Sequence, residues 1–582
     1  MADSDGITPA SKPRNIEAQS AFAASTLVAD FEKAPQPKQP AADTVYGNLY
    51  GSAIETPDIH AGADPVFAAK AQLLNKALLD LGMGRYQWFL WIITSAGWFL
   101  DSFWTMSFLI IGPAASNEAQ FFYASEGNRA AFLFVSMYVG LTVGATAWPF
   151  MADALGRKWI FTSTLVLMGM GGLVGAGMPA FTGLCVVGFV VGFAVAGNQA
   201  VDAMVLLETL PASHQYLVAL QGVFWGLGQL VASAVGWAFI ALWTCGTGPD
   251  EESTAETYAS KAYSHSGSGS SSSSGSSSSS SSGSSSSCHY VSNKGWRYVW
   301  WTFGCITLFL YLCRFMFPLR ETPKFLLARR RDAEATQLVK DIATYNKRQQ
   351  TWLTESSFAR IDSTIDAETV EAQRRTRVGH ILATLKPMGL GLLLLLWAMM
   401  GLTFPLHKTY LSNYLAVHGV SAVNPTTVTT PYLFRQYLWV ALCAIPGPLV
   451  AAVMIEAKWL GRQRSGAIFA VLTGLFMLLS GVSRSHGALL GFECVLSFLY
   501  YADLAILTIY TVEAFATTVR GFSVGVLGGT WRLFGLIAAI ITTFDSTAIA
   551  GGGAVWFSGA IWIVLAGVWL ALPVDTKAKA AA

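Results

Sequence analysis

Charged residues are scarce in this chain of 582 residues. Asp, Glu, Lys and Arg make up 12% of the sequence, whereas 53% is hydrophobic and the mean hydropathy is +0.46. A soluble domain carries about 25% charged residues, so a water-facing surface is excluded for most of the chain. The net charge of +2, with its cations confined to a few loops, also excludes an electrostatic nucleic-acid binder. The chain is therefore predicted to lie mostly within a lipid bilayer.

Cysteines are few, and no familiar catalytic motif is present. Five of the seven cysteines lie in apolar runs without CxxC spacing, so no metal site is expected there: Cys185, Cys305, Cys313, Cys443 and Cys494. The other two, Cys245 and Cys288, bracket a Ser/Gly tract and are either a disulfide or two free thiols. No HExxH string, phosphate-binding loop or nucleophile-base arrangement occurs. Neither enzymatic activity nor a bound cofactor is expected.

The first 80 residues lack an apolar segment, so no cleavable secretory signal is expected. Beyond them lie long apolar runs, each close to the ~20 residues that cross a bilayer as a helix. There are twelve of these runs: 88–112, 130–151, 159–177, 180–207, 217–243, 298–318, 388–406, 433–455, 466–482, 487–510, 521–543 and 552–573. An even number of spans places both termini on the same side.

The distribution of basic residues predicts the orientation. Arg157 and Lys158 follow the second run, and many lysines and arginines lie between the sixth and seventh runs. The positive-inside rule therefore places these loops and both termini in the cytoplasm. The loop 244–296 lies on the opposite side, and its Ser/Gly tract is expected to be disordered.

These boundaries divide the chain into five parts. The N-terminal tail, expected to be largely disordered, and a linker, expected to be partly helical, flank the first of two six-helix bundles. The parts are a tail at 1–87, a bundle at 88–318, a cytoplasmic linker at 319–387, a second bundle at 388–573 and a short tail at 574–582.

The sequence contains an internal repeat. Asp153-Ala154-Leu155-Gly156-Arg157-Lys158 after the second run has a partner in Leu460-Gly461-Arg462-Gln463-Arg464 after the eighth. Likewise Glu208, at the end of the fourth run, has a partner in Glu513 at the end of the tenth. Six plus six spans, related by an axis along the membrane normal, suit a protein that holds a solute between two halves.

These motifs resemble the major facilitator superfamily. The Asp153 to Lys158 string is similar to its loop motif between the second and third helices. Residues 318–327 resemble the element that follows helix six of the sugar-porter branch, and 512–521 resemble the element after helix ten. The resemblance implies an all-α membrane protein with twelve transmembrane helices in two pseudo-symmetric bundles.

Within that superfamily the chain is most similar to the synaptic-vesicle-glycoprotein-like branch, through the pattern at 197–216. The hexose carriers look different, because 396–401 lacks their paired glutamines. A sugar is therefore not the favoured solute.

The resemblance also implies a cytoplasmic gate. Glu208 and Glu513 correspond to gate carboxylates that pair with motif arginines through separable, charge-assisted hydrogen bonds. The expected gate residues are Asp153, Gly156, Arg157, Lys158, Glu208, Arg462, Glu513 and Arg520. Gln215 stands at the repeat position of Arg520, and Lys458 at that of Asp153, so the N-terminal half of the gate is expected to be the looser one.

Ionisable residues within apolar runs are the candidates for mechanism, because each is costly at the bilayer centre unless it faces a cavity or a partner. Asp101, Asp202 and Asp503 are expected on cavity helices, with Asp101 as the proton-coupling carboxylate. Arg532 either neutralises Asp503, the favoured interpretation, or attracts an anionic substrate. Three aromatic residues either contact the solute or pack in the interior: Trp104, Trp225 and Trp397.

Together these features predict a monomeric, proton-coupled symporter of the plasma membrane that works by alternating access. Its expected substrate is a small polar or organic-ion metabolite such as a carboxylate. A sugar or polyol facilitator of the same fold, and a non-transporting nutrient sensor, remain as alternatives.

Overall fold

The computed structural model describes most of the chain outside the tails and several loops. The described residues are 65–116, 118, 129–244, 293–317, 319–348, 351–364, 377–417, 430–457, 459–483, 485–515, 517–544 and 553–573. Within these ranges the regular structure is helical, as predicted. The predicted disulfide partners Cys245 and Cys288, the Ser/Gly tract, Lys458 and both termini lie outside the described residues.

The long helices coincide with the predicted spans. In the first half they are α4 (Arg85–Ser116), α5 (Arg129–Leu155), α6 (Arg157–Ala176), α7 (Phe181–Thr209), α8 (Leu217–Leu220) with α9 (Val223–Trp243), and α11 (Gly295–Phe315). In the second half they are α16 (Arg377–Val417), α17 (Thr430–Ala444) with α18 (Pro446–Glu456), α19 (Gly461–Ser480), α20 (His486–Ala514), α21 (Thr517–Phe544) and α22 (Gly553–Ala571).

Eleven helical segments of the described chain are long and apolar enough to cross a membrane. The remaining predicted span is α4, which has 32 residues but also contains Asp101 and several Trp and Ser residues that lower its hydropathy. α4 packs against α7, α9 and α11, and its mid-helix residues Trp98, Asp101 and Trp104 are buried. With α4, the twelve predicted spans are all helices.

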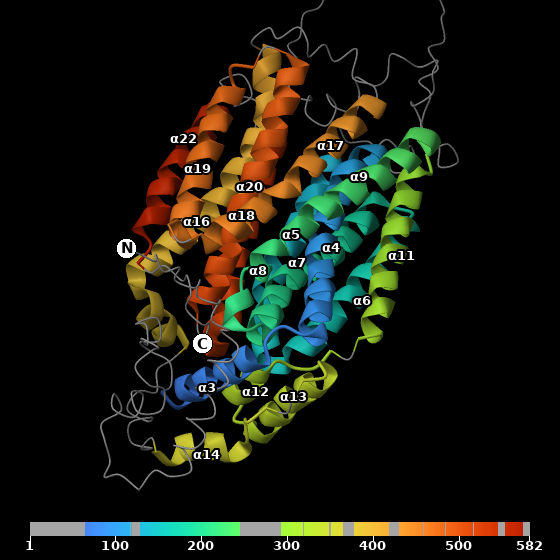
Figure 1. Cartoon of the computed structure of the whole chain (residues 1–582). Helices are drawn as coiled ribbons and strands as arrows, with labels where there is room; N and C mark the ends of the chain where they lie inside the picture. The colour runs from blue at the N-terminus through green and yellow to red at the C-terminus, as the bar shows by residue number, and fades with distance from the viewer. Residues whose placement is uncertain are drawn as a thin grey trace, which may run out of the picture.

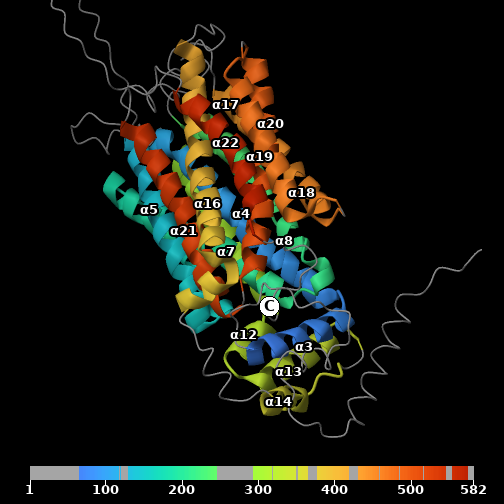
Figure 2. The same ribbon diagram turned by 90° about the vertical axis from the view of Figure 1, so that its left-hand side faces the viewer.

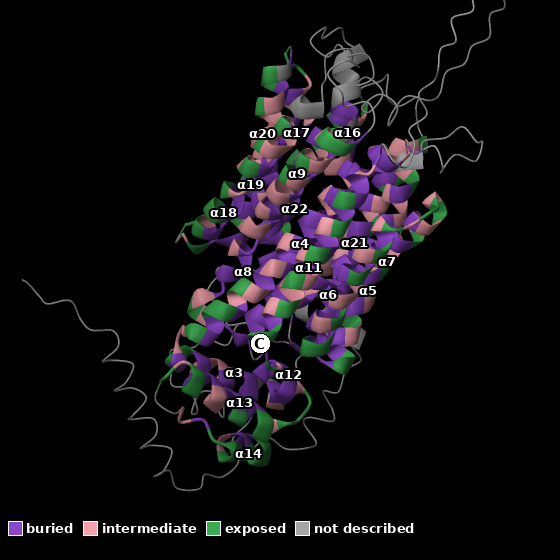
Figure 3. Ribbon diagram, turned by 90° about the vertical axis from the view of Figure 1, so that its right-hand side faces the viewer, coloured by how far each residue is buried: buried purple, intermediate pink, exposed green. Residues whose placement is uncertain are grey.

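The two halves lie side by side as bundles of long helices (Figure 1 and Figure 2). They meet where α5 packs against α21 and where α9 packs against α17. Buried residues concentrate between the helices, and exposed ones lie on the outside (Figure 3). The outward residues include large apolar side chains such as Trp159, Phe309 and Val453, which suits a surface that contacts lipid.

One span is much longer than predicted. The apolar run 388–406 lies inside α16, which continues for 41 residues. Helical backbone hydrogen bonds do not stop at the edge of the hydrocarbon, so apolarity marks the membrane crossing rather than the helix ends.

Four short helices lie across one end of the bundles (Figure 1 and Figure 2): α3 (Pro65–Leu81), α12 (Pro323–Ala328), α13 (Asp332–Tyr345) and α14 (Glu355–Thr364). The last three confirm a partly helical linker. Helix α3 lies within the tail that was expected to be largely disordered, and it buries Phe67, Leu74 and Leu78 on one face. Its Lys70 forms ion pairs of 2.5 Å with Asp332 and 2.7 Å with Asp362.

Candidate functional site

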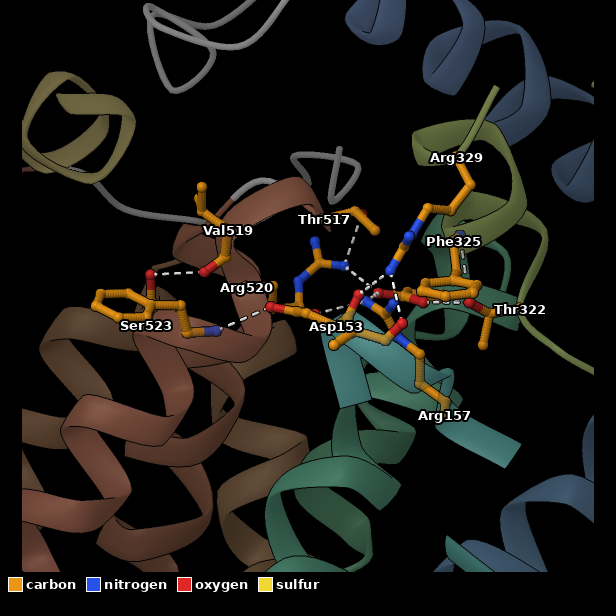
Figure 4. Close-up of polar contacts among 12 residues, drawn as sticks. Asp153, Arg157, Thr322, Phe325, Arg329, Thr517, Val519, Arg520 and Ser523 are labelled. Atoms are coloured by element: carbon orange, nitrogen blue, oxygen red, sulfur yellow. Dashed lines mark hydrogen bonds and ion pairs between the residues drawn. The ribbon is translucent and has the colours of Figure 1, made fainter. Parts of the chain in front are cut away.

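The predicted gate carboxylate Glu208 lies at the inner end of α7 and is fully buried. Its Oε1 accepts hydrogen bonds from Arg157 Nη2 at 3.2 Å and from Arg520 Nη1 at 3.1 Å. The Thr322 hydroxyl donates to its other oxygen. Arg157 comes from the first half and Arg520 from the second, so one carboxylate joins both halves (Figure 4).

Asp153 makes a second connection between the halves. Its carboxylate accepts a hydrogen bond from the Phe522 backbone N–H at 3.1 Å and lies 3.3 Å from Arg157. A Cβ at Gly521 would overlap this carboxylate, so the close approach requires glycine. Gly156 has φ +105°, a conformation that favours glycine, and it makes the sharp turn between α5 and α6.

The linker supplies gate contacts that sequence reasoning missed. Glu321 accepts the backbone N–H groups of Arg157 at 3.1 Å and Lys158 at 3.2 Å, so it caps the N-terminus of α6. Arg329 donates to the carbonyl oxygens of Asp153 and Ala154, both at 2.7 Å (Figure 4). The resemblance of residues 318–327 to a family element was the available signal, but it assigned them no partner.

Burial changes the titration of two of these linker residues. It lowers the pKa of Lys324 to about 7, in an environment that also contains Arg520 and Glu208. It also raises the pKa of Glu321, although the N–H groups that Glu321 caps oppose this rise. This buried cluster therefore contains groups whose protonation can respond to pH.

The second half repeats the carboxylate-arginine pair. Glu513 accepts two hydrogen bonds from Arg462, at 3.2 Å from Nε and 3.1 Å from Nη2. The separation of 51 residues is the same as that between Arg157 and Glu208. However, Arg462 and Glu513 belong to the same half, so this pair does not cross between the bundles.

This geometry corrects the prediction that the N-terminal half of the gate is the looser one. Arg520 of the second half crosses to Glu208 of the first. By the same symmetry, an arginine at position 215 would cross to Glu513. Position 215 of this chain holds an uncharged glutamine instead.

A second ion pair joins the halves near the middle of the membrane. Arg532 Nη2 lies 2.5 Å from Asp101 Oδ1 and 3.4 Å from Gln199 Oε1. Its guanidinium carbon also lies 4.1 Å from the centre of the Trp531 ring. The favoured pairing of Arg532 with Asp503 is thus wrong, because Arg532 reaches across to α4 of the other half.

Asp202 and Asp503 are buried elsewhere. Asp202 packs against Gly97, where a Cβ would overlap its carboxylate, and Asp503 faces the indole of Trp569 without full hydrogen-bond geometry. Neither is among the residues that line the two cavities described next.

Two cavities are lined by residues of both halves. Their order along the long axis of the bundles follows from the residues of α20 that line each one. The inner cavity is lined by residues that include Gln199, Trp397, Thr511, Trp531 and Arg532. The outer cavity is lined by residues that include Gln229, His407, Lys408, Glu493 and Tyr501. On α20 the outer cavity uses residues before 502, the inner cavity uses 508–512, and the gate begins at Glu513.

The three predicted tryptophans separate in the structure. Trp397 lines the inner cavity. Trp104 donates to Thr307 at 3.0 Å inside the first half, and Trp225 stacks on Trp98 with ring centroids 4.5 Å apart. Only Trp397 of the three is therefore found in the lining of either described cavity.

Comparison with known proteins agrees with this arrangement. Residues 93–244 match the family described as "Sugar (and other) transporter". A siderochrome iron transporter of Ceriporiopsis subvermispora, named as a member of the major facilitator superfamily, is 33% identical over 91% of this chain and 95% of its own length. This chain belongs to the major facilitator superfamily. The predicted family, its all-α fold and its multi-pass membrane character are thereby confirmed.

Two further likenesses are found, one in sequence and one in fold. The synaptic vesicle 2-related protein of Rattus norvegicus is 24% identical over 29% of this chain and 32% of its own length, as the predicted branch implies. The proton:xylose symporter XylE bound to 6-bromo-6-deoxy-D-glucose superposes with a TM-score of 0.62, at 14% identity, over 85% of this chain and 98% of its own. That likeness concerns the fold.

Proposed function

We propose that this transporter is a proton-coupled symporter of small organic anions that works by alternating access. The observation that carries the proposal is the ion pair of 2.5 Å between Asp101 and Arg532. It joins the two halves at mid-membrane, and Arg532 also lines the inner cavity. A buried arginine that can exchange its carboxylate partner is a binding site for an anion.

Competition for Arg532 couples the proton to the substrate. When Asp101 takes up a proton, its attraction for Arg532 falls, and a substrate carboxylate takes its place. When the substrate leaves, Arg532 would remain buried without a counterion, so Asp101 releases its proton and pairs again. Proton and anion therefore bind and leave together. Protonation of Asp101 without a bound anion, and anion binding without protonation of Asp101, are both disfavoured.

The cytoplasmic gate completes the cycle. Opening toward the cytoplasm separates Arg520 from Glu208 and the Phe522 N–H from Asp153, the contacts that join the halves there. With the positive-inside orientation, both termini face the cytosol, and the proposed location is the plasma membrane, where the protein works as a monomer.

A ferric siderochrome is the second candidate substrate, because the relative that covers 91% of the chain carries that name. The inner cavity, in which Arg532 is the charged residue among the described lining, favours a small anion instead. A sugar or polyol is less suited still, because Arg532 offers a full positive charge that no hydroxyl group neutralises.

The test is transport by the purified protein in liposomes, with labelled organic acids and with the pH of each side controlled. Asp101→Asn is expected to abolish uphill accumulation and to retain exchange of internal for external anion, because the site still binds but no longer releases a proton. Asp202→Asn is the matched control, since it neutralises another buried aspartate away from both cavities, and it should still accumulate substrate. Accumulation driven by pH in Asp101→Asn would refute the coupling role.

A further inference from the structure

The inner cavity combines one charge with mostly apolar walls. Among the described residues that line it, Arg532 is the one charged side chain, and polar side chains otherwise come from Gln199, Thr508 and Thr511. A single cation can neutralise a single carboxylate. A second carboxylate on the substrate would be buried without compensation, which strongly disfavours dianions.

Two indole rings form part of the wall. The rings of Trp397 and Trp531 have centroids 5.8 Å apart, at an interplanar angle of 58°. Trp397 is held in place because its Nε1 donates to Thr511 Oγ1 at 3.0 Å. The Arg532 guanidinium lies over Trp531, so the anion site and the aromatic wall are adjacent.

The first half contributes a smooth surface to the same cavity. Ala196, Ala200 and Ala203 of α7 line it at helical spacing, and Gly528 of α21 adds a position without a side chain. These methyl groups form an apolar face beside Gln199, the polar residue that α7 contributes to the same lining. A flat apolar body therefore suits this space better than a hydroxylated one.

We infer that the transported anion is a planar aromatic monocarboxylate. Its carboxylate takes the place of Asp101 at Arg532, and its ring lies among the indoles of Trp397 and Trp531 and the alanine face of α7. This inference rests on the proposed anion transport and adds the shape and charge of the substrate. The single charge of Arg532 limits the substrate to one carboxylate. The aromatic and alanine walls favour a flat apolar ring as the rest of the substrate.

The experiment compares three acids in liposomes that contain the full chain. Labelled benzoate is the probe, and unlabelled cyclohexanecarboxylate and phthalate compete with it at an inward pH gradient. Cyclohexanecarboxylate has the same charge without the flat ring, and phthalate has the ring with a second charge. Both are expected to inhibit benzoate uptake at least tenfold less well than unlabelled benzoate.

The outcomes separate this inference from the proposed function. Equal inhibition by benzoate and cyclohexanecarboxylate would overturn the aromatic assignment and leave anion transport standing. If neither labelled benzoate nor labelled cyclohexanecarboxylate is taken up faster than by protein-free liposomes at the same gradient, anion transport itself is refuted.

Two variants test the walls directly. Trp397→Leu should reduce the preference for benzoate over cyclohexanecarboxylate at least fivefold, and Trp397→Phe should keep most of it, because phenylalanine restores a ring without the bond to Thr511. Trp439→Leu is the control, since this tryptophan is 51% exposed on α17 and should leave the preference unchanged. An unchanged preference in Trp397→Leu would refute a role for the ring, provided that the variant still transports.

Discussion

The two gate carboxylates, Glu208 and Glu513, occupy equivalent places in the internal repeat but have different surroundings. Each pairs with an arginine 51 residues earlier in the sequence. Glu208 additionally accepts Arg520 from the opposite half and the Thr322 hydroxyl from the linker. Glu513 is held by Arg462 of its own half. The repeat has therefore kept the pair within each half, and Glu208 also forms an ion pair with Arg520 of the other half.

The difference shows which contacts oppose opening. A pair within one half moves as a unit when the bundles separate, so Arg462 and Glu513 stay together. The pair between Glu208 and Arg520 must break, and it leaves two buried charges that need water or new partners. We therefore propose that the contact of Glu208 with Arg520 opposes separation of the two halves at this end.

Neutralising each carboxylate is expected to have the largest effect and gives the sharpest contrast. Glu208→Gln leaves Arg157 and Arg520 without a buried counterion and should weaken the closed gate by about 3–5 kcal/mol. Glu513→Gln should have a smaller effect on the gate, because it alters a contact within one half. Labelling of an engineered cysteine on the cytoplasmic side of the inner cavity measures the open fraction, and equal labelling of the two variants would contradict the comparison.

Restoring the missing arginine should make the halves more alike. Gln215→Arg places a guanidinium where repeat symmetry brings it to Glu513, and a charge-assisted hydrogen bond of this kind contributes about 1.5–3 kcal/mol. The closed gate should become more stable, so turnover should fall about tenfold while substrate affinity from outside is retained. Gln215→Lys is the control, because it adds the charge without the bidentate geometry. Faster turnover in Gln215→Arg would refute the proposed symmetry.

The smallest expected effect is a response of the gate to pH through Lys324. Burial lowers its pKa to about 7, whereas an exposed lysine titrates near pH 10.4, so the closed gate binds fewer protons than a gate that exposes Lys324. The closed gate is then weakest below about pH 7 and gains stability as the pH rises from there toward about 10. Between cytoplasmic pH 6 and 8 its ratio to the open gate should increase about tenfold.

Cysteine labelling at the two pH values measures this ratio, with Lys324→Met as the comparison. The variant should lose most of the dependence, because it removes the titrating group and keeps an apolar stem of similar length. A full tenfold response in Lys324→Met would assign the pH dependence to another group. Glu321 would not be that group, because burial raises its pKa, and a raised carboxyl pKa favours the closed gate at low pH rather than at high pH.

The spans and the pairs within each half could be predicted from the sequence. Membrane thickness dictates the length of an apolar run, and the repeat places Arg157 near Glu208 in the same way as Arg462 near Glu513. These are relations between neighbouring helices of one half. They depend on local pattern and on symmetry, both of which are visible in one sequence.

The contacts across the halves could not be predicted in the same way. Asp101 and Arg532 are 431 residues apart, and the packing of the bundles, rather than any local pattern, decides that they meet. Glu321 was overlooked because, in the sequence, a carboxylate within a charged linker is expected to be solvent-exposed. Only the tertiary structure shows that it accepts a hydrogen bond at the N-terminus of α6. Helix α3 had a detectable signal, since Phe67, Leu74 and Leu78 are spaced for one helix face.

The side-chain hydrogen bonds that flank helix α12 attach it to the first bundle, and this attachment affects how the linker moves during transport. Glu321 and Arg329 hold it to the turn between α5 and α6, and Thr322 holds it to the end of α7. The beginning of the linker is thereby part of the first bundle and would be carried along as that bundle tilts. A molecule that bound α12 would act mainly on the first bundle, to which these hydrogen bonds attach it, although α12 also packs against α21 of the second. Such binding would change the rate of transport without contact with the substrate.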